Sequence, residues 1–178
     1  MTNAERLLGA VDERLSCSVE LTLYGRAALH LGFPNPPHDY ALSRDVDAVL
    51  WIGQAEELIE GSNFWEVIEE VNALFSDQEL YISHFFEESQ VILTPDWRLK
   101  RLPVIRNWKN LKLFRLGNED LFLSKLMRDD PIDRMDAQFI VDSGPLSQEQ
   151  IRCAINSARI PPVPEIAEQF LRCSRRFV

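Results

Sequence analysis

Asp45 and Asp47 are the residues of this sequence whose type and spacing are best suited to chemistry. They lie in residues 43–51, SRDVDAVLW, where an apolar run encloses and follows them. If this run is a β-strand, both acids point to one face, with Cα atoms about 7 Å apart. Two carboxylates this close resist joint ionisation unless a cation lies between them. Mg²⁺ is a suitable cation, since it binds one or two protein carboxylates together with substrate phosphates.

A D-x-D pair is weak evidence on its own. The chain is rich in aspartate, so such a pair is expected by chance, and strand ends near solvent also carry acids without function. The interpretation therefore depends on the neighbouring segments.

The segment before the aspartates predicts a turn that could bind phosphate. Residues 19–24 alternate as a strand, Gly25 follows, and residues 26–32 indicate a short helix. Glycine at such a turn lets backbone N–H groups approach a phosphate, and a helix N-terminus favours negative charge. Arg26 lies at the same turn. A plain tight turn would explain Gly25 alone, but the order of strand, glycine, helix and D-x-D strand favours a phosphate site beside a metal site.

Apolar periodicity predicts a mixture of helices and strands. Two capping boxes, Thr2 with Glu5 and Ser147 with Gln150, mark helix starts. Helices are expected over residues 3–16, 63–76, 118–127, 133–142, 148–158 and 164–175, with Asn118 as an N-cap, and strands over 45–50, YISHFF, QVILT and LKLFRL. YISHFF and QVILT are expected to form a hairpin around residues 87–89. We therefore predict an α+β fold: a small mixed sheet with flanking helices in residues 1–116, and a helical C-terminal part, 117–178, packed on it.

Composition limits the partners and the compartment. The net charge of −9 does not steer the 178-residue chain toward nucleic-acid phosphates, so we expect no DNA partner. The three cysteines form no C-x-x-C motif and suit a reducing cytoplasm. The N-terminus lacks the apolar stretch of a signal peptide, and no apolar run is long enough to span a bilayer. We expect a cytoplasmic protein with no membrane partner.

Two stretches together resemble a known family. LYGRAALHLGF followed by SRDVDAVLW resembles the nucleotidyltransferase superfamily, whose signature is an apolar strand, Gly-Gly or Gly-Ser, a helix and a strand with two alternating aspartates. EDLFLSKLMRDDPIDRMDAQFIV resembles the helical motif of the minimal, AbiEii-like branch. The matching positions in that motif are Asp120, Leu121, Lys125, Leu126, Arg128, Asp133 and Asp136. The resemblance covers about residues 19–142.

The resemblance implies an activity and a set of roles. The activity is transfer of a nucleoside monophosphate from an NTP to a protein side chain or a tRNA end, in a toxin-like protein with a cognate antitoxin-type partner. Mg²⁺ would be held by Asp45 and Asp47, and Lys125 would act with them in catalysis. The nucleotide would be bound by Gly25, Arg26, Arg44, Lys125 and Asp136.

Several alternatives stay open. Position 26 is arginine where the family commonly has glycine or serine, and the third carboxylate of many members has only unclear candidates in Glu87, Glu88 and Asp96. The alternative function is a catalytically inactive nucleotidyltransferase-fold protein that binds a nucleotide or a partner. Lys125 could instead be a surface lysine paired with Asp129. The histidines, His30, His38 and His84, show no metal-ligand spacing and are expected to be structural or exposed.

Overall fold

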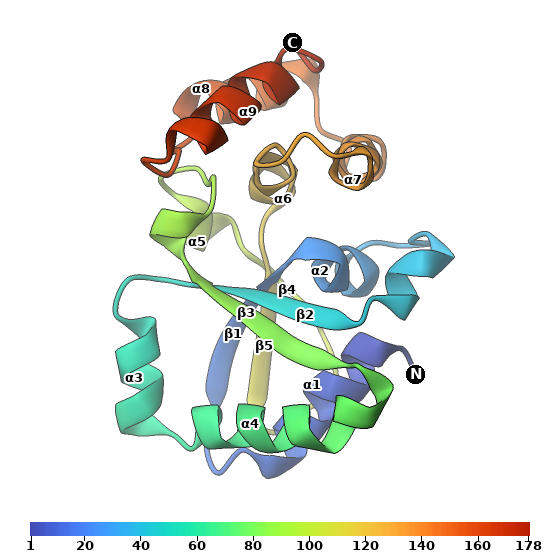
Figure 1. Ribbon diagram of the computed structural model, residues 1–178, viewed down its shortest axis with the longest axis vertical. Helices are drawn as coiled ribbons and strands as arrows, with labels where there is room; N and C mark the ends of the chain where they lie inside the picture. Colours follow the sequence, from blue (N-terminus) through green and yellow to red (C-terminus); the bar gives the residue numbers. More distant parts are fainter. The chain divides into compact units, whose positions relative to one another are not determined.

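The computed structural model describes residues 1–178, and the chain divides into two compact units (Figure 1). Unit 1 comprises Met1–Phe86 and Pro103–Arg115, and unit 2 comprises Glu87–Leu102 and Leu116–Val178. The predicted α+β class is confirmed, because the chain has one mixed five-stranded sheet together with many helices. The division differs from the predicted boundary at residue 116, since residues 87–102 belong with the helical unit.

The sheet has the strand order β3-β2-β1-β5-β4 and is organised around β1 (Val19–Tyr24). On one side of β1, β2 (Asp45–Leu50) runs antiparallel; on the other, β5 (Leu111–Arg115) runs parallel. The outer strands are β3 (Tyr81–Glu87) and β4 (Leu102–Pro103). Even Thr22 of β1 is fully buried, as expected for a strand covered on both faces.

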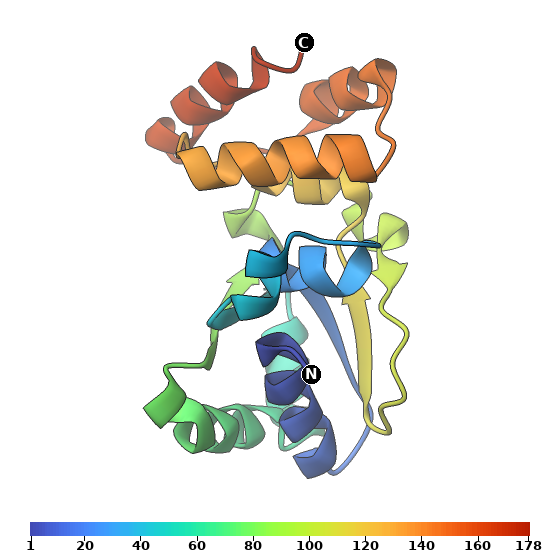
Figure 2. The ribbon, with the colours of Figure 1, turned by 90° about the vertical axis from the view of Figure 1, so that its right-hand side faces the viewer.

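Four helices pack in unit 1. They are α1 (Asn3–Arg14), α2 (Gly25–Gly32), α3 (Gln54–Gly61) and α4 (Phe64–Phe75), with short 3-10 turns at His38–Leu42 (η1) and Ser76–Gln78 (η2). The Thr2–Glu5 capping box is present, and α1 packs its apolar face on β2, β5 and α4. Figure 2 shows α1 beside strands β1 and β5. Helix α2 packs on β1, which ends just before the turn at Gly25, and on β2, which carries the aspartate pair.

Asp12 ties α1 to the start of β5. Its carboxylate accepts hydrogen bonds from the backbone N–H groups of Lys109 (2.9 Å), Asn110 (2.7 Å) and Leu111 (2.7 Å). Burial by itself would raise the pKa of Asp12, but the three backbone donors outweigh it, and the pKa lies below its ordinary value. The ionised carboxylate therefore stabilises the junction at which β5 enters the sheet.

Unit 2 is nearly all helix. Its helices are α5 (Trp97–Lys100), α6 (Asn118–Ser124), α7 (Pro131–Ser143), α8 (Gln148–Ser157) and α9 (Pro164–Ser174), with a 3-10 turn at Glu88–Gln90 (η3). Helix α6 packs against both α7 and α8. The Thr94 N–H donates to the buried carboxyl of Asp120 (2.7 Å), which joins the segment before α5 to α6, and burial raises the pKa of Asp120 to about 6.

Two expectations about local structure are wrong. QVILT does not pair with β3 in a hairpin, because the chain turns away through η3, where the Glu87 N–H donates to Gln90 Oε1 (2.9 Å), and Leu93 makes an isolated bridge to Arg159. Asn118 does not cap α6. Gly117 holds the N-cap position, and the Asn118 side chain donates to the carbonyl of Gly144 instead (2.9 Å).

Replacing Asp12 tests the junction between α1 and β5. We expect Asp12→Ala to lower the free energy of unfolding by about 2 kcal/mol at pH 7, because three backbone donors lose a charged acceptor. Since the folded pKa is lowered, this stabilisation is present above the ordinary pKa of about 3.9 and is lost as the pH falls through the folded value. The gap between wild type and variant, measured by urea unfolding, should narrow below about pH 4. Glu13→Ala, an exposed neighbour, is the control, and an equal effect of both variants would contradict this account.

Candidate metal and phosphate site

The aspartate pair lies in unit 1, on β2, beside the end of β1. Asp45 is exposed and Asp47 is half-buried. Val46, which lies between them, and Ala48, which follows Asp47, are fully buried. The alternation predicted from the sequence is therefore observed. The register of β1 against β2 places Asp47 opposite Tyr24, the residue directly before Gly25.

Gly25 brings the first turn of α2 against Asp47. Its φ of +70° is a left-handed backbone conformation that residues other than glycine rarely adopt. A Cβ atom at this position would lie 3.2 Å from Asp47 Oδ2. The side chain of the N-cap residue, Tyr24, makes no capping hydrogen bond, and no acid lies in the first turn of α2. The partial positive charge of this helix end favours the nearby Asp47 carboxylate. The structure thus joins the two predicted features, the turn at Gly25 and the D-x-D strand, in one corner of unit 1.

His84 adds to the pair a third side chain of a type that can ligate a metal. It lies on β3, next to β2, and the ligand atoms of Asp45, Asp47 and His84 lie within 4.8 Å of one another. The Nδ1 atom of His84 is 2.9 Å from Asp47 Oδ1. The imidazole is 56 % exposed, in keeping with the expected exposure, but sequence reasoning missed its position. No spacing signals it, because the three residues meet only through the pairing of two strands more than thirty residues apart.

Neighbouring groups orient the side chains of Asp45 and His84. The Ser43 hydroxyl donates to Asp45 Oδ1 (2.8 Å), and the Ser83 hydroxyl is 2.9 Å from His84 Nδ1. The Phe86 ring stacks on the imidazole, with centroids 5.4 Å apart and planes at 18°. Two carboxylates and an imidazole, supported in this way, are a donor set that suits a divalent ion.

The two arginines predicted at the nucleotide have partners of their own. The Arg26 guanidinium lies 3.2 Å from Asp39 of η1 and over the ring of Tyr40, 4.9 Å from its centroid. Arg44 is exposed and pairs with Glu79. Arg26 therefore stays beside the start of α2, whereas the Arg44 charge is directed to the turn that follows α4.

The acids considered for a third carboxylate make contacts inside unit 2. Glu88 accepts from the Trp97 indole (2.9 Å), and Asp96 pairs with Lys100 (3.0 Å). Glu87 accepts from the Ser89 hydroxyl (2.6 Å). Within unit 1, the third donor beside Asp45 and Asp47 is the imidazole of His84.

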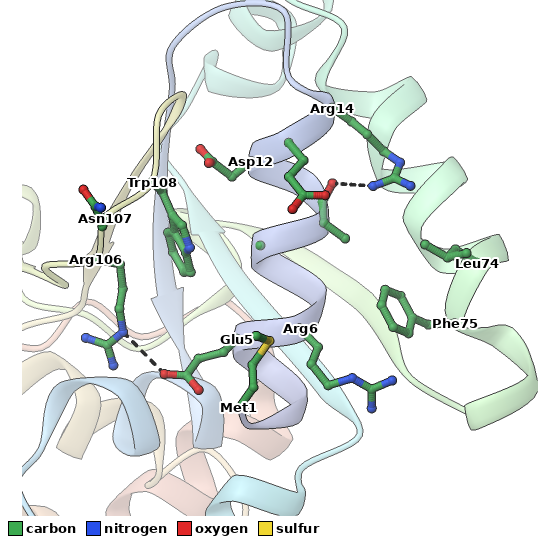
Figure 3. A pocket seen from close by; sticks show the side chains of 13 residues that line it. Met1, Glu5, Arg6, Asp12, Arg14, Leu74, Phe75, Arg106, Asn107 and Trp108 are labelled. Carbon is green, nitrogen blue, oxygen red and sulfur yellow. Dashed lines mark hydrogen bonds and ion pairs between the residues drawn. The ribbon is translucent and has the colours of Figure 1, made fainter.

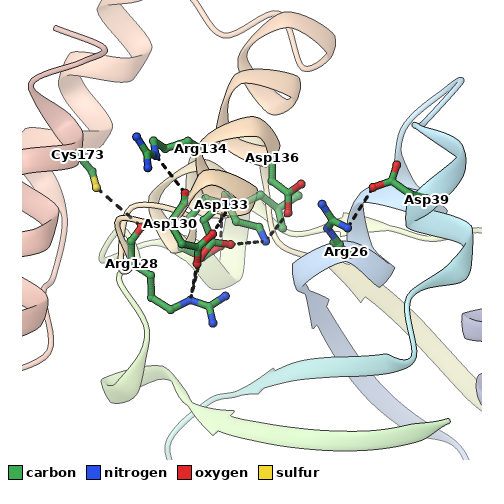
Figure 4. A network of polar contacts seen from close by, with 11 residues as sticks. Arg26, Asp39, Arg128, Asp130, Asp133, Arg134, Asp136 and Cys173 are labelled. Carbon is green, nitrogen blue, oxygen red and sulfur yellow. Dashed lines mark hydrogen bonds and ion pairs between the residues drawn. The ribbon is translucent and has the colours of Figure 1, made fainter. Parts of the chain in front are cut away.

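Lys125 and Asp136, both predicted to act at the nucleotide, contact each other in unit 2. Figure 4 shows the position of Asp136 in this polar network, near Asp133. Lys125 Nζ lies 2.8 Å from Asp136 Oδ2 and 3.0 Å from Asp133 Oδ1. The side chains of Lys125, Asp133 and Asp136 are 9 %, 3 % and 0 % exposed. The alternative of a surface lysine is wrong, and so is its pairing with Asp129, whose carboxylate pairs with Arg176 instead.

The buried triad of Lys125, Asp133 and Asp136 joins α6 to α7. Lys125 is the C-cap of α6, and both aspartates lie on α7, which begins after Asp130 caps the N–H of Asp133 (2.8 Å). Arg128 Nε also binds Asp133 (2.8 Å). The buried ammonium of Lys125 between the two buried carboxylates is needed for stability, because removing it would leave buried negative charge uncompensated.

A separate groove of about 840 Å³ runs along α1 in unit 1 (Figure 3). Its lining includes Trp108, Phe75 and three arginines. Of these, Arg6 lies over the Phe75 ring (5.2 Å) and Arg106 is 3.5 Å from Glu5. The aspartate pair is not among its lining residues. The groove is distinct from the cluster of Asp45, Asp47 and His84.

Comparison of the chain with protein-family models, with curated proteins and with solved structures finds no match. Among the helices, none combines the length and the apolar character needed to cross a membrane. The function is therefore argued from the geometry of the site and from the sequence patterns.

Replacing Gly25 tests the turn. We expect Gly25→Ala to lower the free energy of unfolding by about 1–2 kcal/mol, because the left-handed backbone is costly for alanine. The new methyl group would also press on Asp47. Gly9→Ala on α1, where a Cβ meets nothing within 4 Å, should instead stabilise by about 0.5–1 kcal/mol. Urea unfolding measures both, and a stabilising Gly25→Ala would contradict the strained turn.

Replacing Lys125 tests the buried triad. We expect Lys125→Met to lower the free energy of unfolding by about 3–5 kcal/mol, because two buried carboxylates lose the ammonium that lies between them, although Arg128 stays beside Asp133. Arg152→Ala, on the exposed face of α8, should change it by no more than about 0.5 kcal/mol. Chemical denaturation at pH 7 gives both values. A Lys125→Met variant as stable as Arg152→Ala would show that the ion pairs do not hold α6 to α7.

Proposed function

We propose that the chain is a metal-dependent nucleotidyltransferase, which transfers a nucleoside monophosphate from an NTP to a protein or tRNA acceptor. The observation that carries the proposal is the contact between the turn at Gly25 and Asp47, with Asp45 and His84 alongside. A helix N-terminus that can bind phosphate and a donor set that can bind a divalent ion are the two parts that transfer from a triphosphate requires.

Each group has a proposed role. Asp45 and Asp47 hold the ion, for which the sequence predicts Mg²⁺; a bound divalent ion neutralises phosphate charge and stabilises the charge that develops on the reacting oxygens. The start of α2 lies where it could receive phosphate oxygens, and Gly25 permits their close approach. Reactions of this kind need mainly positioning and charge neutralisation from the protein.

The basic residues complete the proposed nucleotide site. Arg26 carries a positive charge at the same helix end, and its pair with Asp39 limits the positions it can take. The role of Lys125 and Asp136 at a nucleotide stays a prediction from the resemblance, since both belong to unit 2 and form a buried ion pair there. Arg44 contributes least, because it is exposed and paired with Glu79.

The setting follows from charge and composition. A net charge of −9 favours a protein acceptor over a tRNA end, unless a basic partner supplies the surface that attracts RNA. We propose a cytoplasmic protein, where NTPs and Mg²⁺ are at hand, and an antitoxin-type partner in a two-gene system.

The second candidate is an inactive nucleotidyltransferase-fold protein that binds a nucleotide or partner without turnover. It is favoured by two observations: an imidazole, rather than a carboxylate, is the third group of the cluster, and position 26 of the phosphate turn is a large arginine.

Transfer from α-labelled nucleotides tests the activity. We expect label from one of the four NTPs to appear on purified tRNA or on cellular protein in the presence of Mg²⁺. Asp45→Asn and Asp47→Asn should each reduce transfer at least about a hundredfold, as loss of a group that stabilises the transition state does. Asp77→Asn, an exposed acid of η2, is the matched control.

One result would contradict the assignment of the aspartate pair, and another would favour the second candidate function. Transfer that survives in Asp45→Asn and Asp47→Asn would contradict the assignment of the aspartate pair. Nucleotide binding that depends on both aspartates but is never followed by transfer would favour the inactive binding protein.

A further inference from the structure

We propose that His84 is a third ligand of the ion held by Asp45 and Asp47, and that its imidazole makes the site prefer Mn²⁺ over Mg²⁺. This inference rests on the proposed function for the ion itself, and adds the ligand and the identity of the metal. The sequence predicted only that His84 is structural or exposed, whereas in the structure its ring lies beside the two aspartates.

The distances suit ligation. Two neighbouring ligand atoms at right angles on an ion with bonds of about 2.1 Å lie about 3 Å apart. His84 Nδ1 and Asp47 Oδ1 are separated by 2.9 Å, and the ligand atoms of Asp45 also lie within 4.8 Å of both. Small side-chain adjustments would let all three meet one ion.

The imidazole is oriented by its surroundings. Phe86 stacks on one face of the ring, and Phe86 is itself packed edge-on against Tyr24, with centroids 5.8 Å apart. Ser83 approaches Nδ1 at 2.9 Å. A ring more than half exposed would otherwise sample several rotamers, so this packing keeps Nδ1 directed at the aspartates.

A simple ion pair between His84 and Asp47 explains only one contact. It does not account for the position of Asp45, which lies on the same face of β2 and within reach of the same point. The three candidate ligand atoms come from two neighbouring strands, and those of Asp45 and His84 each have a further hydrogen bond or ring contact, as the ligands of metal sites do.

The donor set selects among divalent ions. Mg²⁺ prefers oxygen ligands and keeps several of its waters, so an imidazole adds little to its binding. Mn²⁺ accepts carboxylate and water oxygens as Mg²⁺ does. As a first-row transition-metal ion it also binds an imidazole nitrogen more readily than Mg²⁺, which strongly prefers oxygen. A site of two carboxylates and one imidazole should therefore bind Mn²⁺ more tightly, while serving the same phosphate chemistry.

Direct titration of Mn²⁺ tests the inference without an activity assay. The solution electron paramagnetic resonance signal of free Mn²⁺ is measured as the full chain is added, and Mg²⁺ is then added to displace the bound Mn²⁺. We expect His84→Ala and His84→Gln to weaken Mn²⁺ binding at least about tenfold, the smallest loss usual when a supporting group of a metal site is removed. The affinity for Mg²⁺ should stay nearly unchanged, so the preference for Mn²⁺ falls.

The controls separate this inference from the proposed function. His38→Ala, an exposed histidine of unit 1, should leave Mn²⁺ binding unchanged, and Asp45→Asn with Asp47→Asn should abolish binding of both ions. Circular dichroism shows that each variant is folded. If the His84 variants bind Mn²⁺ as tightly as wild type while the double aspartate variant does not, the role of His84 is overturned and the aspartate site stands. If wild type binds neither ion, the metal site and the proposed function fall together.

Discussion

The register between β1 and β2 is the constraint on which the candidate site depends. It sets Tyr24 opposite Asp47, so the turn that follows β1 at Gly25 meets the Asp47 carboxylate. A slip of one residue would send both aspartates to the opposite face of the sheet and bring Val46 and Ala48 out. Burial of these two residues therefore holds the acids in place, and the apolar core specifies the position of the polar site.

The two charged clusters of the chain are stabilised in different ways. Asp45 and Asp47 are only partly buried, and water, the Ser43 hydroxyl, the His84 imidazole and the N-terminus of α2 can offset their charge. Asp133 and Asp136 are almost wholly buried, and they depend on the ammonium of Lys125. The first cluster is thus open to an added cation, whereas the second carries its own.

This contrast bears on what the helical motif does. The family resemblance implies that Lys125 and Asp136 of this motif, in which Asp133 is a further matching position, belong to a nucleotide site. In the structure the three residues form a buried link between α6 and α7, which is sufficient reason for their types and spacing. A further contact of Lys125 with a nucleotide would have to use the part of the ammonium that these two aspartates leave available.

Local patterns predicted much of this protein, because they depend on neighbours in the chain. Apolar alternation located β1 and β2, the capping boxes located the starts of α1 and α8, and the order of strand, glycine and D-x-D suggested the two halves of the site. Tertiary structure alone decided that His84 joins the aspartates, that QVILT leaves the sheet, and that Lys125 is buried rather than exposed. Each of these depends on pairing or packing between segments distant in sequence. The residue type at one position does not predict which distant residue will contact it in the folded chain.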